Sequence, residues 1–453
     1  MVEREHTPEC FRGWQEFPKN LSLSLLHVDS NRCSVRLSQD SERLFVSDKD
    51  SRLWALVIDN AGVTKDGQRD VRHVTFQDSS QLASYLEQSS SSTHISFIRQ
   101  SFSWGRLLIS ENMLRKLFTS QNVHPNFLDV VHTFGEKAEP VEESFSAFFY
   151  HPLSQYQALG SESPNENAGY VIGYNIKYVA GHGRPFLKDP YSVRETGVFQ
   201  LCANSSASAQ RCSWVFIHPS DALEERLGEV FKNAKQTTCT LQFQIHALVL
   251  LSVSDNWRTY TNYLEESFRR LLERGFYTNI NGPTVEGDID TDFSDIRKLQ
   301  LLTDKLRRLC HILQLNINLG TQLKSCMQQI KDRTCAVSSS VSSFDSFNSQ
   351  MDLFISQHRT HLARIESLVS RAQGVSGLIQ SILDIRTAES SSRINTAVHD
   401  ITQQGIQENK LIKQLTHQST QDTRAMKLIA LISAIFLPAT FVAVGLFWRC
   451  RHC

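Results

Sequence analysis

The chain has 453 residues, a length sufficient for about two or three domains that each bury a hydrophobic core. Hydrophobic residues make up 40% of it and charged residues 21%, which is an ordinary globular balance. The 47 basic and 47 acidic residues cancel, so the chain has no overall positive field that would attract a nucleic acid. We therefore expect no nucleic-acid partner.

Residues 1–35 show little hydrophobic periodicity, and we expect them to form a loosely packed lead-in. Their first part contains no apolar run of the kind found at the centre of a secretory signal peptide. The ten cysteines of the chain are scattered and have no metal-ligand spacing. These features favour a body that faces the cytosol and keeps its thiols reduced.

Residues 36–232 mix strand-like and helix-like patterns. The apolar runs Leu53–Ile58, Tyr170–Tyr174 and Trp214–Ile217 have the length and composition of strands. Between them, Ser110–Thr119 carries apolar residues at helical spacing. The sequence thus predicts an α/β or α+β domain, and it leaves the order of the strands open.

Residues 233–350 are predicted to form a helical pair followed by a connector. The first helix is expected over Leu241–Leu272 and the second over about Ser294–Ile330, where leucines recur at steps of three and four. The serine-rich stretch Ser338–Ser349 is the expected connector. The apolar stripe of the second helix consists of Leu299, Leu302, Leu306, Leu309, Leu313 and Ile317.

Residues 351–427 are predicted to form one long stalk helix. Its apolar stripe weakens between Arg386 and Arg393 and then resumes. A helix of this length needs partners along its face, within the chain or between subunits, so we expect coiled-coil packing and a homo-oligomer. The stripe consists of Leu362, Ile365, Val369, Ala372, Val375, Ile379 and Ile382, and further on of Ile394, Val398, Ile401, Leu411 and Leu415.

Residues 428–448 contain no charged side chain and read LIALISAIFLPATFVAVGLFW. At 1.5 Å per residue such a helix is about 31 Å long, which matches the hydrocarbon thickness of a bilayer. The sequence therefore predicts a membrane protein with one transmembrane helix in the lipid bilayer, and the alternative is a core helix of a soluble protein. The positions that we assign to the span are Leu428, Phe436, Pro438, Phe441 and Trp448.

Basic residues on the two sides of this segment indicate its orientation. More of them precede the segment than follow it, which favours a cytosolic location for the N-terminal bulk. The short tail 449–453 implies insertion after translation, as in a tail-anchored protein. The preceding basic residues are Lys410, Lys413, Arg424 and Lys427, and the following ones are Arg449 and Arg451.

Asp288, Asp290 and Asp292 resemble the start of a calcium-binding loop. An EF-hand is excluded, because Phe293 stands at the sixth position and Leu299 at the twelfth. We interpret the cluster as negative charge that stabilises the N-terminus of the following helix. A weak regulatory cation site at a subunit boundary is the alternative.

Other motifs predict no metal centre and no catalytic site. His358 and His361 lie three positions apart on the stalk and are expected at its surface, and Cys450–Cys453 offers too few ligands for a metal. The chain has no nucleotide-binding or hydrolase motif, so we expect no enzyme and no resident cofactor. The tryptophans expected as core or interface anchors are Trp54, Trp104, Trp214 and Trp257.

Several segments, taken in order, are similar to those of one family. Thr423–Lys427 lead into Phe436–Ala443, and Leu107–Glu111, Asn175–Tyr178 and Asn256–Arg258 support the likeness. The chain resembles the fungal branch of CorA-like divalent-cation transporters. The resemblance implies a cytosolic α/β domain, a helical stalk and a pentamer in which the long helix lines the pore.

In that family the pore helix ends in a Gly-Met-Asn loop that meets the hydrated ion before a second membrane helix. At the corresponding place this chain reads Gly445–Cys450, so the resemblance assigns no metal-binding residue here. It implies Mg²⁺ as a transported or regulatory ion. We expect an incomplete pore region, for which a gene model that departs from the family after Ala443 is one explanation.

Two functions are therefore expected from the sequence. The first is transport of a divalent cation of the Mg²⁺ type. The alternative is a tail-anchored coiled-coil scaffold or regulatory subunit without transport activity.

Overall fold

The computed structural model describes residues 8–21, 28–63, 69–88, 93–139, 141, 143–153, 169–185, 189–204, 210–234, 239–334 and 340–450. The chain divides into two compact units. The first consists of Met1–Glu273 with Arg297–Val375, and the second of Arg274–Ile296 with Ser376–Cys453.

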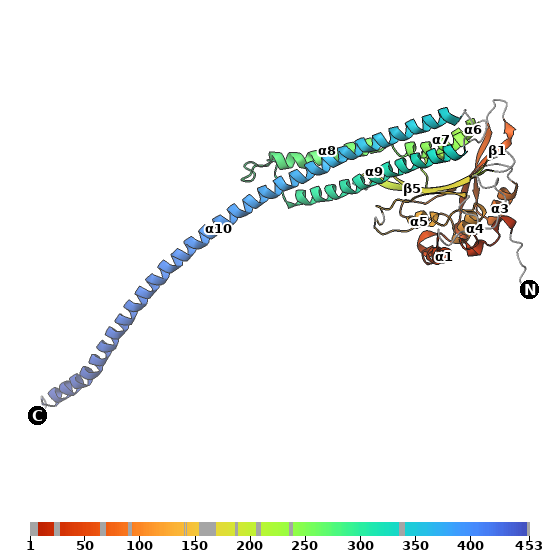
Figure 1. The fold of residues 1–453 in the computed structure, drawn as a ribbon. Coiled ribbons are helices and arrows are strands. Elements are labelled where there is room, and N and C mark those ends of the chain that lie inside the picture. Colours follow the sequence, from red (N-terminus) through yellow and green to blue (C-terminus); the bar gives the residue numbers. More distant parts are fainter. Residues whose placement is uncertain are drawn as a thin grey trace, which may run out of the picture. The chain divides into compact units, whose positions relative to one another are not determined.

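A seven-stranded mixed sheet forms the centre of the first unit (Figure 1). Its order is β2-β1-β3-β7-β6-β5-β4, and of its neighbouring pairs only β3 and β7 run parallel. This arrangement confirms the predicted mixed α/β domain. The strands are β1 Leu53–Val63, β2 Arg69–Phe76, β3 Thr93–Ile98, β4 Phe148–Pro152, β5 Gly169–Gly181, β6 Tyr191–Asn204 and β7 Gln210–Ile217.

Both faces of the sheet are covered, which explains the continuous apolar runs of its central strands. In β7, Trp214 and Phe216 belong to one hydrophobic core, while Val215 and Ile217 belong to the other. Figure 1 shows α7 and α9 on one side of β5 and α4 and α5 on the other. The unit therefore has three layers, with the sheet in the middle.

Short helices and the N-terminal segment cover one face. Ser110 precedes α4, and its Oγ accepts a hydrogen bond from the backbone N–H of Met113 at 3.3 Å, which is a standard helix N-cap. The predicted loose lead-in is wrong in part, because Phe11 and Phe17 are fully buried in this core. The helices are α1 Ser30–Gln39, α2 Ser41–Leu44, α3 Ser79–Gln88, α4 Glu111–Ser120 and α5 Phe127–His132, with short 3-10 turns at Glu9–Phe11, Trp14–Glu16 and Asp48–Asp50.

Longer helices cover the other face. The helix predicted over Leu241–Leu272 is divided into α7 Cys239–Ser252 and α8 Trp257–Tyr277, which follow α6 Asp221–Asn233. The break has a local cause, because Ser, Asp and Asn side chains at positions 254–256 compete with helical hydrogen bonding. The predicted second helix is α9 Phe293–Thr334.

The last helix, α10 Ser340–Arg449, contains most of the serine-rich stretch that we predicted to be a connector. Phe344 and Phe347 are buried there, and each ring centroid lies 5.9 Å from that of Phe243 on α7. Burial of these two rings stabilises the helical conformation, which overrides the local preference of serine for turns.

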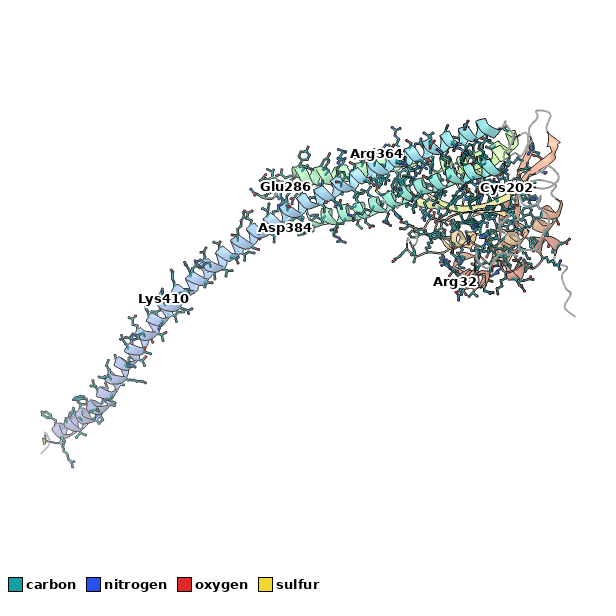
Figure 2. All side chains as sticks on the ribbon, in the orientation of Figure 1. Arg32, Cys202, Glu286, Arg364, Asp384 and Lys410 are labelled. Atoms are coloured by element: carbon teal, nitrogen blue, oxygen red, sulfur yellow. The ribbon has the colours of Figure 1, made fainter. Side chains whose placement is uncertain are left out.

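In the second unit, α10 continues without a break through Pro438. Its apolar stripe is buried as far as Leu383, and every residue from 390 to 450 except Gly405 is exposed. Figure 2 shows the side chains around Lys410 standing free about the helix. In the other segment of this unit, buried Asp295 accepts a 2.7 Å bond from Arg274 Nε.

Candidate functional site

One described helix, α10, is long and apolar enough to cross a membrane. Its most apolar stretch has a mean hydropathy of 2.4, and none of it is buried. All five positions that we assigned to the span lie on this helix with exposed side chains: Leu428, Phe436, Pro438, Phe441 and Trp448.

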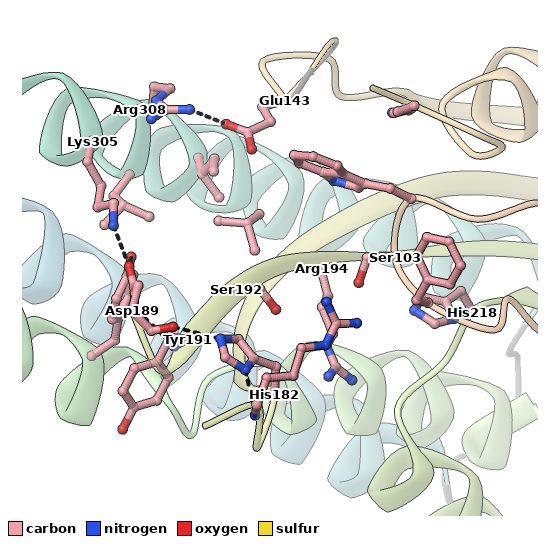
Figure 3. A pocket seen from close by; sticks show the side chains of 18 of the residues that line it. Ser103, Glu143, His182, Asp189, Tyr191, Ser192, Arg194, His218, Lys305 and Arg308 are labelled. Carbon is pink, nitrogen blue, oxygen red and sulfur yellow. Dashed lines mark hydrogen bonds and ion pairs between the residues drawn. The ribbon is translucent and has the colours of Figure 1, made fainter. Parts of the chain in front are cut away.

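A separate cavity of about 720 Å³ lies in the first unit. Its wall consists of the loop 101–104, the ends of β5 and β6, and side chains from α8 and α9. Figure 3 shows Lys305 and Arg308 on α9 across from His182 and Arg194. The cavity is thus built from segments far apart in the chain, and we did not predict it.

Asp189 organises one wall of this cavity. Its Oδ1 accepts from the backbone N–H of Tyr191 at 3.0 Å, and its Oδ2 accepts from the Tyr260 hydroxyl at 3.0 Å and from Lys305. Its backbone oxygen accepts from Nε2 of His182 at 2.6 Å. Nδ1 of His182 accepts from the backbone N–H of Arg184 at 3.0 Å, so both ring nitrogens have partners.

The second carboxylate of the wall is also paired. Glu143 lies 3.4 Å from Nη1 of Arg308 (Figure 3). Lys305 and Arg308 of α9 thus neutralise both acids, and three further cations remain among the described residues that line the cavity. They are Lys137, Arg184 and Arg194.

His218 adds no charge to this wall at neutral pH. Burial and the neighbouring Arg194 lower its pKa to about 4. The cavity therefore has an excess of positive charge.

The predicted aspartate cluster does not converge on one point. Asp292 Oδ1 accepts from the backbone N–H of Ser294 at 2.8 Å, which places negative charge at the start of α9 as we expected. Asp288 accepts from the backbone amides of Thr284 and Val285, which lower its pKa. Asp290 forms a 2.8 Å ion pair with Arg386. Over the described residues, no group of three or more His, Cys, Asp or Glu side chains could hold a metal ion.

The prediction that His358 lies at the surface is wrong. Its side chain is fully buried, with Nδ1 at 3.0 Å from the Phe354 carbonyl and Nε2 at 3.4 Å from Asn316 Nδ2. His361, one turn further, is half-buried. The pattern of apolar residues along α10 does not reveal that a histidine can be buried when it finds hydrogen-bond partners inside the helical layer.

The four tryptophans differ in their surroundings. Trp214 and Trp257 are fully buried, as expected of core anchors, and Trp54 packs under Arg99 with 5.0 Å between guanidinium and ring. Trp104 is 39% exposed and lines the cavity. Cys450 is exposed at the end of α10, while residues 451–453 of the predicted tail lie outside the described part of the chain.

The structure thus combines a three-layer α/β unit with one described helix that is long and apolar enough to cross a membrane. The comparison with known families agrees. The family model of CorA-like transporters matches residues 9–275, more than half of the chain, and the chain belongs to this family. No curated protein matches it.

This family membership confirms the resemblance to CorA-like transporters that the sequence indicated. CorA-like proteins are membrane-embedded, generally oligomeric transporters and channels, and they are not enzymes. The match ends within α8, before α9 and α10. The membrane assignment of α10 therefore depends on its own length and composition.

Proposed function

We propose that the chain is a subunit of a membrane transporter for divalent cations of the Mg²⁺ type. The observation that carries this proposal is the match of residues 9–275 to the CorA-like transporters. The apolar stretch of α10 supports it, because a transporter subunit needs a membrane helix. Transport of this kind requires no covalent step, only a path that is open to the ion.

In this proposal residues 428–448 cross the bilayer, residues 351–427 form the stalk, and residues 36–232 form a cytosolic domain. Pro438 is compatible with the span, because membrane helices tolerate proline better than soluble ones. The larger number of basic residues before the span supports the cytosolic orientation of the body.

The proposed assembly is a homo-oligomer, a pentamer by resemblance to the family, joined through α10. Exposed apolar side chains beyond residue 390 support such contacts. An inside-negative potential of about 100 mV would favour entry of a doubly charged ion by about 4.6 kcal/mol. Movement of the long helices would open and close the path.

Because we expect an incomplete pore region in residues 1–453, the test is Mg²⁺ uptake into cells that express the protein from its full natural transcript, followed with an intracellular Mg²⁺-sensitive dye. We expect faster uptake than in control cells, and we expect depolarisation of the membrane to slow it. Membrane-bound protein at normal abundance without any added uptake would contradict transport. That result would favour the alternative of a scaffold or regulatory subunit.

The membrane span can be tested separately with the double variant Ala439→Asp, Val442→Asp. Central acidic residues cost about 2.5 to 3.5 kcal/mol each, so the variant should fail to insert and should be released by carbonate extraction. The matched control is Gln403→Asp, Gln407→Asp, which places the same charges on the exposed part of α10 before the span. Retention of the first variant in the carbonate pellet would argue against the span.

A further inference from the structure

The cavity of the first unit has the charge of an anion-binding site. Among the described residues that line it, the two carboxylates are paired with Lys305 and Arg308, so a further negative group would meet an excess of positive charge. A metal ion would meet the opposite situation, because neither carboxylate is free and both ring nitrogens of His182 are engaged.

The remaining cations are available to a ligand. Among the described residues, Lys137 Nζ donates only to the Val141 carbonyl at 3.3 Å. Arg194 Nη2 reaches the Gly181 carbonyl at 3.5 Å, and the guanidinium also contacts Tyr178. Within the described ranges, neither these two nor Arg184 forms an ion pair with a carboxylate. In addition, Nε of Arg194 is buried and has no hydrogen-bond partner among the described residues, as expected for a donor whose acceptor is supplied from outside.

Aromatic rings stand beside this charge. Phe102 is 50% exposed and Trp104 is 39% exposed, and both line the cavity. Tyr191 and Tyr260 also line the cavity, and their ring centroids lie 5.0 Å apart. Large apolar rings left this open in a polar cavity are typical of a surface on which a planar ligand group stacks.

We propose that this cavity binds a phosphorylated small molecule with a planar ring, of which a nucleoside triphosphate is the simplest example. Arginine and lysine suit phosphate oxygens through charge-assisted hydrogen bonds, and Arg184, Arg194 and Lys137 supply them here. Trp104 and Phe102 stack on the ring. A volume of about 720 Å³ lies in the usual range for small-molecule sites. The site is independent of the proposed transport activity.

The experiment is isothermal titration of the full chain in lipid nanodiscs with ATP in an EDTA buffer, so that Mg²⁺ binding does not contribute. We expect saturable submillimolar binding, weakened about ten-fold by Arg184→Gln and about ten-fold by Trp104→Ala. Both side chains are exposed enough that the fold should survive, which unchanged melting of the unliganded variants would verify. Inorganic tripolyphosphate should bind about ten-fold more weakly than ATP, because it lacks the ring.

The matched control is Arg36→Gln, which removes the same charge from α1, where Arg36 pairs with Asp129. Its affinity for ATP should equal that of the unmodified chain. The proposal is overturned if millimolar ATP gives no saturation, or if Arg184→Gln and Trp104→Ala bind ATP as tightly as the control.

Discussion

His246 lies at the centre of a buried chain of hydrogen bonds that joins α7 to the sheet. Its Nε2 donates to Oε1 of Gln200 at 2.8 Å, and its Nδ1 accepts from the Tyr174 hydroxyl at 3.0 Å. Gln242 Oε1 accepts from Gln200 Nε2 and from Trp214 Nε1, each at 2.9 Å. Burial lowers the pKa of His246 to about 3, so the folded protein keeps this imidazole neutral.

This lowered pKa predicts a loss of stability in acid. Between about pH 3 and 6.5 the unfolded chain binds a proton at His246 and the folded chain does not, so the free energy of unfolding falls as the pH falls below 6.5. In His246→Gln this contribution is absent. Between pH 7.5 and 5.0 the variant should therefore lose about 2 kcal/mol less stability than the unmodified chain.

Urea unfolding of the full chain in detergent, followed by tryptophan fluorescence at several pH values, measures this difference. His311→Gln is the control, because it makes the same replacement at an exposed position of α9. If the free energy of unfolding falls equally with pH in the His246 variant and in the unmodified chain, the burial of His246 does not cause the loss of stability in acid.

At the scale of elements, Arg386 holds the α8–α9 loop against α10 within the second unit. Its Nε donates to the Ile280 carbonyl at 3.0 Å and its Nη2 to the Asn279 carbonyl at 2.5 Å, while Nη1 pairs with Asp290 at 2.8 Å. A single guanidinium thus satisfies two carbonyls just beyond the end of α8 and one carboxylate of the predicted aspartate cluster. Arg386 lies just beyond Leu383, the last buried residue of the apolar stripe of α10.

We expect Arg386→Ala to loosen this loop. Loss of the three contacts should cost about 1 to 3 kcal/mol locally, because hydrogen bonds to a charged group are lost together. Hydrogen–deuterium exchange should therefore be about 5- to 150-fold faster at protected amides of residues 278–292. Arg393→Ala is the control, since Arg393 contacts only Glu389 of its own helix among the described residues. Equal exchange in both variants would contradict the role given to Arg386.

At the scale of the whole molecule, α10 carries an apolar stripe that the single chain leaves uncovered. Ile394 is 60% exposed, Val398 55% and Ile401 68%. They continue the spacing of Ile379 and Ile382, which are buried. An exposed stripe with the period of a coiled coil is typical of a helix that packs against copies of itself.

Replacing Ile394, Val398 and Ile401 together with serine should lower the mass of the assembly. We expect smaller oligomers in mass photometry of the detergent-solubilised protein, with an unchanged melting temperature of the body, since these side chains are not part of either core. The control replaces Asn395, His399 and Thr402 with serine, one position along the same helix and therefore on another face. An unchanged mass for the first variant would argue against assembly through this stripe.

The sequence by itself determined the local and periodic features. The run Trp214–Ile217 is a strand because its residues suit a sheet buried on both faces, and Ser110 begins a helix because its hydroxyl caps the next turn. Length and composition alone show that residues 428–448 could cross a membrane. The order of short segments along the chain was sufficient to indicate the CorA-like family.

Only the tertiary structure decided which polar side chains are buried and which distant residues meet. His358 is buried because Asn316, 42 positions away, lies beside it, and no spacing along α10 reveals that neighbour. Lys305 meets Asp189 across 116 positions, and Arg308 meets Glu143 across 165. The cavity therefore depends on strand order and helix packing, which arise from long-range contacts that the local pattern of side chains does not encode.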